Sequence, residues 1–114
     1  MISISQQATC TRFGAPFEPP DAFQMVGLAR VARTGRWPVH GLRHPVQGQS
    51  CGWFIWAVDD DIPTEPTAFE PVHVSHLAED LPCVVPYLAL SPGWRFLLAP
   101  GYEDVWYDPS LLLI

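Results

Sequence analysis

Residues that end regular structure recur along the whole sequence. It contains 13 prolines and 8 glycines among 114 residues. Proline removes a backbone donor and breaks the interior of helices and central strands, and glycine weakens both. This spacing disfavours long helices and long regular sheets, so we expect short elements joined by turns.

The composition nevertheless supports a folded core. Hydrophobic residues make up 48% of the chain, which excludes intrinsic disorder, and no apolar run approaches the roughly 18 residues of a membrane span. We therefore expect a single domain over residues 1–114, with about two-thirds of its surface buried. The first ten residues lack the basic and apolar stretches of a secretory signal, which favours a cytoplasmic protein. The unpaired spacing of Cys10, Cys51 and Cys83 predicts free thiols.

Charge is distributed unevenly along the chain. Residues 1–58 contain five arginines and two acids, whereas residues 59–114 contain one arginine and ten acids, which together give the net charge of −6. Such a protein repels nucleic acids and anionic membranes, so neither is an expected partner. An acidic domain that binds another protein fits this charge. The alternative is that the excess acid only keeps a small domain soluble.

The N-terminal third predicts an edge strand, a loop and a helix. Ile2–Phe13 begins with alternating isoleucines and is interpreted as an edge strand, and a proline-rich loop follows it within a loop-rich segment over residues 1–20. Asp21 and Gln24 form the pattern of a capping box. Apolar residues beyond them share one helical face, which predicts a helix over residues 22–34 that ends at Gly35. The stretch 25–31 also fits a strand.

Aromatic and β-branched residues predict two antiparallel pairs of strands. Residues 51–58 form the strongest strand, apolar on both faces, and residues 39–44 precede it closely enough to pair with it as a hairpin. Trp94–Ala99 and residues 104–107 predict a second pair around a turn at Pro100 and Gly101.

The segments between these pairs predict one more strand and a second helix. Residues 72–74 fit a short strand, residues 75–81 a helix begun by Ser75, and residues 84–88 a further helical turn. The whole is an α+β domain with an antiparallel sheet of four to five strands and two main helices. We expect one contiguous core to include Trp53, Ile55, Trp94, Phe96 and Trp106.

Two kinds of chemical site were considered from the residues. His73 and His76 are spaced to share a helical face near Cys83, but no second ligand pair completes a zinc site, so we expect no metal, no cofactor and no structural disulfide. No phosphate-binding loop, nucleophile elbow or metalloprotease signature is present, so no catalytic residue is expected. The alternative function is a small metal- or thiol-dependent enzyme that uses Cys51, His40, His44 and His73.

Exposed acids and aromatics are the better candidates for a binding site. Acids cluster after the central strand and near the last hairpin, where loops would present them to a partner, and Trp37 lies beside an arginine in a loop. The expected partner-binding residues are Trp37, Asp59, Asp60, Asp61, Glu65, Tyr102, Glu103 and Asp104. For Glu103 and Asp104, the alternative is that they serve the fold by capping or by pairing with an arginine such as Arg95.

Several strings of the sequence resemble one known family. They are WPVHGLRHP (37–45), CGWFIW (51–56), FEPVHVSHL (69–77), PYLAL (86–90), PGWRFL (92–97) and GYEDVWYD (101–108). Together they are similar to the immunity-protein thirty-three-like family of bacterial polymorphic toxin systems, over about residues 37–112. Where this chain reads Ala57-Val58-Asp59, the family pattern has a glycine followed by a glutamate, so the turn after the central strand is expected to differ.

The resemblance implies a small cytoplasmic immunity protein. Such a protein neutralises a toxin delivered by, or encoded beside, a secretion system such as type VI, commonly by occluding the active site of the toxin. The expected partner is therefore a cognate toxin protein that acts in the cytoplasm. An adaptor domain that shares only the family name is the remaining alternative.

Overall fold

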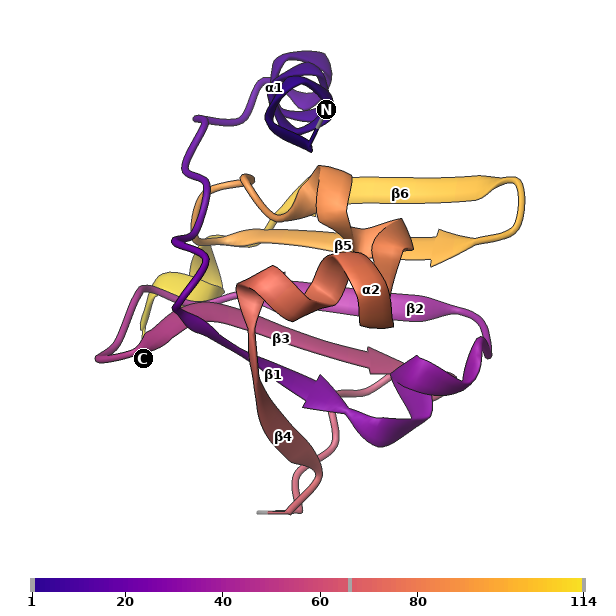
Figure 1. Cartoon of the computed structure of the whole chain (residues 1–114). Coiled ribbons are helices and arrows are strands. Elements are labelled where there is room, and N and C mark those ends of the chain that lie inside the picture. Colours follow the sequence, from indigo (N-terminus) through magenta and orange to yellow (C-terminus); the bar gives the residue numbers. More distant parts are fainter. Residues whose placement is uncertain (1, 66, 114) are drawn as a thin grey trace.

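The computed structural model describes residues 2–65 and 67–113, with side chains from Ser5 onward. One sheet organises this part of the chain (Figure 1). Its strands are β1 (Met25–Ala29), β2 (Val39–Arg43), β3 (Ser50–Ala57), β4 (Phe69–His73), β5 (Trp94–Ala99) and β6 (Tyr102–Tyr107). The α-helices are α1 (Ile2–Phe13) and α2 (Leu77–Asp80), and the 3₁₀-helices are η1 (Arg30–Thr34), η2 (Val74–His76), η3 (Pro82–Tyr87) and η4 (Pro109–Leu113).

The sheet is mixed, with its described strands in the order β4-β1-β3-β2-β5-β6. β1 runs parallel to β3, and every other neighbouring pair is antiparallel. The α+β class and the two expected hairpins, β2–β3 and β5–β6, are confirmed. The described sheet has six strands rather than four to five. It also contains one parallel pair, β1–β3, and β1 lies in the segment that was expected to be a helix.

The helix expected over residues 22–34 is instead β1 followed by η1. The alternative interpretation as a strand is therefore correct for Met25–Ala29. Packing explains the result, because a Cβ on Gly27 would lie 2.6 Å from the ring of Phe54, so the glycine admits this ring against the strand. The N–H of Asp21 does donate to Oε1 of Gln24 (2.9 Å), but this half of a capping box closes a turn and no helix.

Ile2–Phe13 forms α1 and not the expected edge strand. Its buried residues Gln6, Thr9 and Cys10 follow the i, i+3, i+4 spacing of one helical face. Nε2 of Gln6 donates to the carbonyl of Val85 (3.0 Å), so a polar side chain holds α1 against η3. The buried face of α1 is therefore not apolar enough for the sequence pattern to predict a helix. The second expected helix, 75–81, is also shorter: η2 and α2 replace it, and Ser75 makes no cap hydrogen bond.

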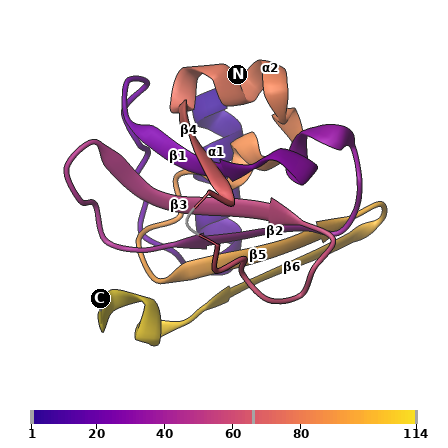
Figure 2. The same ribbon diagram turned by 90° about the horizontal axis from the view of Figure 1, so that it is seen from below.

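The two faces of the sheet are covered differently. α1 and α2 lie on one side, and the C-terminal turn η4 lies on the other (Figure 2). We call these the helix-covered face and the opposite face. The main core fills the helix-covered face and includes Trp53, Ile55 and Phe96, with Trp94 packed at its border. A smaller cluster on the opposite face contains Ala29, Leu42, Trp56 and Leu111.

Trp106 does not join the expected core. It pairs with Arg95 across β5 and β6, and both side chains project from the opposite face, since Phe96 and its partner Val105 belong to the helix-covered one. Trp106 is half-buried there, with the guanidinium of Arg95 5.3 Å from its ring centroid. Alternation along β6 therefore separates Trp106 from the other four residues.

Candidate functional site

Loops from distant parts of the chain meet at one end of the sheet, on the right in Figure 1. β2 and β6 begin there and β3 and β5 end there, because Val39 pairs with Ala57 and Leu98, and Leu98 pairs with Glu103. Most of the expected binding residues lie at this end and are exposed. We call it the acidic end and define it by Trp37, Asp59, Asp60, Asp61, Tyr102 and Asp104; Glu65 is also exposed but lies further along the loop towards β4.

A strained turn fixes the start of the loop that follows β3 and carries Asp59, Asp60 and Asp61, which we call the acidic loop. The N–H of Asp59 donates to the carbonyl of Ala57 (3.0 Å) around Val58, whose φ is +77°. This is a γ-turn of the strained form, which a β-branched residue rarely adopts. The N–H of Val58 donates to the carbonyl of Pro38 (2.9 Å), and the indole Nε1–H of Trp56 donates to the carbonyl of Asp59 (2.9 Å). Three hydrogen bonds therefore set the direction in which the loop leaves β3.

The acids of this end make no salt bridge among the described residues. This holds for Asp59, Asp60, Asp61 and Asp104, and also for Glu65 further along the loop. Exposed acids without partners keep their full charge for an incoming molecule.

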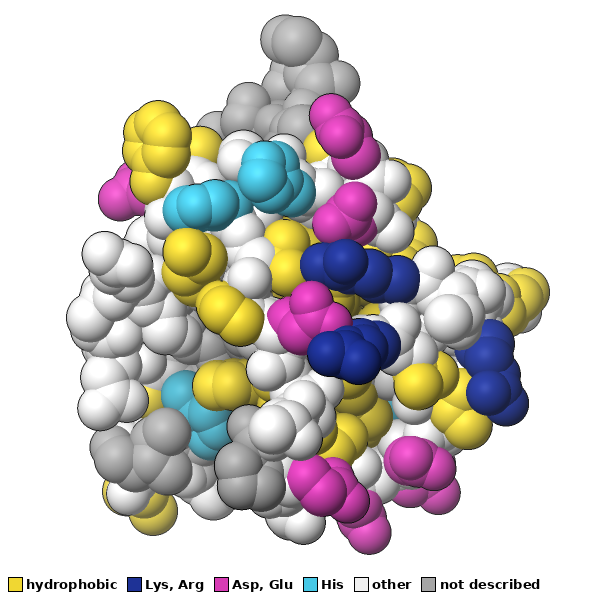
Figure 3. Space-filling view, turned by 60° about the horizontal axis from the view of Figure 1, so that its bottom comes forward, with side chains coloured by type: hydrophobic (Ala, Val, Ile, Leu, Met, Phe, Trp, Pro, Cys, Tyr) yellow, Lys and Arg dark blue, Asp and Glu magenta, His cyan; other side chains and the backbone are white. Residues whose placement is uncertain are grey.

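Arginines lie next to this end and make the surface around it mixed in sign. η1 follows β1 and carries Arg30 and Arg33, which pair with Glu70 (2.6 Å) and Asp80 (3.7 Å). Figure 3 shows dark blue basic and magenta acidic side chains next to one another on this face of the molecule. These pairs partly even out the charge in space, whereas Asp59, Asp60, Asp61 and Asp104 make no salt bridge among the described residues.

Glu103 serves the fold. Its carboxylate accepts from Arg12 (Nη1 2.5 Å, Nη2 3.0 Å) and from the hydroxyl of Tyr87. The Arg12 guanidinium lowers the pKa of this carboxyl. Burial, together with the hydrogen bond to Glu103, raises the pKa of Tyr87 to about 12. The structural alternative is thus correct for Glu103, with Arg12 in place of Arg95, and the contact joins α1 to β6. Asp104, the next residue, makes no such bond.

One cross-strand row connects the acidic loop to Asp104. The register places Trp56 beside His40, His40 beside Leu97, and Leu97 beside Asp104 on the opposite face. His40 stacks on Trp56 with ring centroids 5.1 Å apart, and its Nε2 is buried without a hydrogen-bond partner in the described chain. Burial lowers the pKa of His40, so its ring is neutral at pH 7.

The residues of the enzymatic alternative do not come together. Cys51 is fully buried in the main core on the helix-covered face, whereas His40 lies on the opposite face. Burial raises the pKa of the Cys51 thiol, which disfavours the thiolate that nucleophilic catalysis needs. His44 is bound through Nδ1 to the carbonyl of Leu111 (3.0 Å). Among the described residues, no group of three or more His, Cys, Asp or Glu could hold a metal ion.

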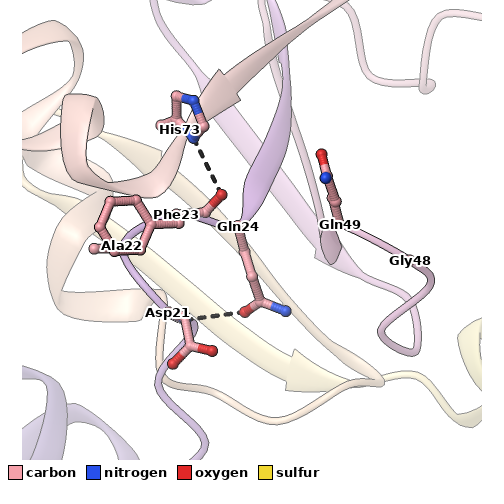
Figure 4. Close-up of a pocket in the computed structure, with 7 residues that line it drawn as sticks. All are labelled: Asp21, Ala22, Phe23, Gln24, Gly48, Gln49 and His73. Carbon is pink, nitrogen blue, oxygen red and sulfur yellow. Dashed lines mark hydrogen bonds between the residues drawn. The ribbon is translucent and has the colours of Figure 1, made fainter.

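A hollow of about 600 Å³ lies at the other end of the sheet (Figure 4). Its rim is formed by Asp21, Ala22, Phe23, Gln24, Gly48, Gln49 and His73. Nδ1–H of His73 donates to the carbonyl of Phe23 (3.1 Å), so this histidine holds the loop before β1. The ring of Phe23 projects away from His73 and is 84% exposed. The hollow is lined by one carboxylate, that of Asp21, and by one imidazole, whose Nδ1–H is already bound to the carbonyl of Phe23.

Sequence reasoning missed the row that accompanies the acidic end. Leu97 and His40 had no pattern that linked them to the acids, because the link depends on β2 lying between β3 and β5. A signal for β6 was present, since strict alternation places Tyr102, Asp104 and Trp106 on one face and Glu103 on the other.

The described residues form a sheet whose exposed loops carry charge and aromatic surface, and no catalytic group is assembled among them. Comparison with known families identifies the class of protein. The Imm33-like domain model matches residues 5–108, and the chain belongs to that family of immunity proteins. The match begins earlier than the resemblance over residues 37–112 and includes most of α1. Neither the curated proteins nor the solved structures contain a match. No described helix is long and apolar enough to cross a membrane.

Proposed function

We propose that this protein is an immunity protein that binds a cognate toxin through the acidic end and occludes the active site of the toxin. The observation that carries the proposal is a set of four acids that make no salt bridge among the described residues, at the same end of the sheet as the exposed rings of Trp37 and Tyr102. Family membership supports the role, because an immunity protein must bind its toxin.

The local geometry supports this surface over other parts of the molecule. Strained backbone persists where the surroundings enforce it, and such strain is concentrated at binding and catalytic sites. The γ-turn at Val58 places this strain directly before Asp59. A loop that is already ordered loses little entropy when it binds, which favours tight association.

The charge of the acidic end suits a cationic site. A toxin that acts on nucleic acid or on nucleotides in the cytoplasm would have such a site, and negative loops would speed the encounter with it. The proposed function requires no catalysis by the immunity protein and no cofactor.

The test uses the toxin domain encoded beside the gene for this chain, in a catalytically inactive form. We expect Asp60→Lys/Asp61→Lys to reduce the association rate about tenfold or more at low salt, because steering acts mainly on association. The difference should shrink at 0.5 M salt, where charges are screened beyond a few ångströms. Surface plasmon resonance measures both rates.

A matched control is available in Asp21→Lys/Glu79→Lys. These acids are also exposed and without a salt bridge in the described chain, and they lie outside the acidic end. The control changes the net charge by the same amount and should alter association less than threefold. If both double variants slowed association equally, only the net charge would matter and the acidic end would have no special role. If neither variant changed the association rate, the proposed role of the acidic end would be wrong.

A further inference from the structure

The opposite face of the sheet is open over β5 and β6. Over β1, β2 and β3 this face is covered, since Leu111 of η4 packs with Ala29, Leu42 and Trp56. Further along the sheet, Leu97 and Trp106 are half-buried, and Tyr102 and Asp104 are exposed. This open part adjoins the acidic end and includes two of its residues.

Within this part the chain already binds one of its own cations. The guanidinium carbon of Arg95 lies 5.3 Å from the ring centroid of Trp106, and Nη1 lies 3.3 Å from Oδ2 of Asp108. The ring and the carboxylate belong to residues i and i+2 of one segment. An aromatic face together with a carboxylate is a recognised site for a guanidinium or an ammonium group.

Tyr102 and Asp104 repeat this spacing four residues earlier in the chain. They are again residues i and i+2, and alternation places them on the same face as Trp106. Their partners on β5 are Ala99 and Leu97, so no basic side chain faces them as Arg95 faces Trp106. Tyr102 is 53% exposed, and Asp104 has no salt bridge in the described residues.

We propose that Tyr102 and Asp104 bind a lysine or arginine side chain of the toxin, as Trp106 and Asp108 bind Arg95. This inference rests on the proposed function for the identity of the partner. The aliphatic stem of the bound residue lies against Leu97, which is half-buried beside Asp104, while its charged group reaches the carboxylate. The acids Asp59, Asp60 and Asp61 attract the partner over a longer range, and the pair holds it at contact.

The test measures the affinity of variants for the inactive toxin domain by calorimetry. Asp104→Asn and Tyr102→Ala should each weaken binding about tenfold or more, whereas Tyr102→Phe keeps the ring and should stay within threefold. The loss for Asp104→Asn should appear mainly as faster dissociation, unlike that for Asp60→Lys/Asp61→Lys.

Glu103→Gln is the matched control. It removes the same charge from the neighbouring residue, whose side chain is bound on the other face, and should leave affinity within twofold. A charge-reversed toxin residue should restore binding to Asp104→Lys. If the wild type binds but Asp104→Asn and Tyr102→Ala bind equally well, this inference is wrong and the proposed function stands. If the wild type does not bind the toxin, both are overturned.

Discussion

At the scale of single residues, Arg43 holds together three segments that are distant in sequence. Its buried guanidinium donates through Nε to the carbonyl of Cys51 (3.0 Å) and through Nη1 to the carbonyls of Glu18 (2.7 Å) and Leu90 (2.8 Å). It makes no salt bridge among the described residues. Neutral carbonyls therefore compensate its burial.

Arg43→Met should be among the most destabilising single substitutions. It keeps much of the side-chain volume but leaves several buried carbonyls without donors, so the free energy of unfolding should fall by about 3–5 kcal/mol. Urea denaturation measures this loss. Arg36→Met, at an exposed arginine, is the control and should stay within about 0.5 kcal/mol. A shift of similar size in both would contradict the role of the buried guanidinium.

Tyr87 makes stability sensitive to high pH. Its pKa is raised to about 12, so the folded state resists ionisation that the unfolded state undergoes near pH 10. This contribution is complete below about pH 10 and is lost as the pH rises towards 12. Tyr87→Phe should therefore lose less stability than the wild type between pH 9 and about 11.5. Denaturation series at several pH values compare the two, and parallel curves would contradict the assignment.

At the scale of elements, the β2–β3 hairpin depends on a close approach at Gly52. The φ of Gly52 is +98°, and a Cβ there would lie 1.8 Å from the carbonyl oxygen of His44. Because that oxygen is backbone, it cannot move aside as a flexible side chain would. Gly52→Ala should cost about 3 kcal/mol or more in urea denaturation. Gly48→Ala, also at positive φ but with no atom within 4 Å, should cost only about 1 kcal/mol.

Elements with strong alternation were predictable, and elements held by single contacts were not. β3 and β5 follow from β-branched and aromatic residues that must cover both faces of a sheet, and β2 follows from the prolines that bound it. α1 was missed because its anchor is the amide of Gln6, and β1 was missed because the role of Gly27 appears only beside Phe54. The local sequence pattern shows neither the contact of Gln6 nor the approach of Phe54 to Gly27.

The same limit applies to the candidate site. Exposed acids and Trp37 could be named from composition and loop position alone. Their meeting at one end depends on strand order, and the γ-turn at Val58 depends on a hydrogen bond to Pro38, which belongs to a separate segment of the chain. The role of Glu103 could not be separated from that of Asp104 without knowing that Arg12 lies on a helix above β6.

At the scale of the whole molecule, the sheet combines local and distant pairings. The β2–β3 and β5–β6 hairpins join neighbours in sequence, whereas β1 reaches its parallel partner β3 only after β2 has been traversed. Pairing between distant segments costs more chain entropy than a hairpin does. The strands that carry the exposed loops of the acidic end are therefore held both by neighbours in sequence and by distant segments.

The open order of this sheet has a consequence for how the protein behaves in concentrated solution. β4 and β6 are its two edges, and an uncovered edge invites another chain to add to it. β4 contains Pro71, which offers no N–H, and β6 carries Glu103 and Asp104. One edge is thus protected by covalent structure, but the other is protected by charge. Salt screens the second protection, so association at high ionic strength would begin along β6.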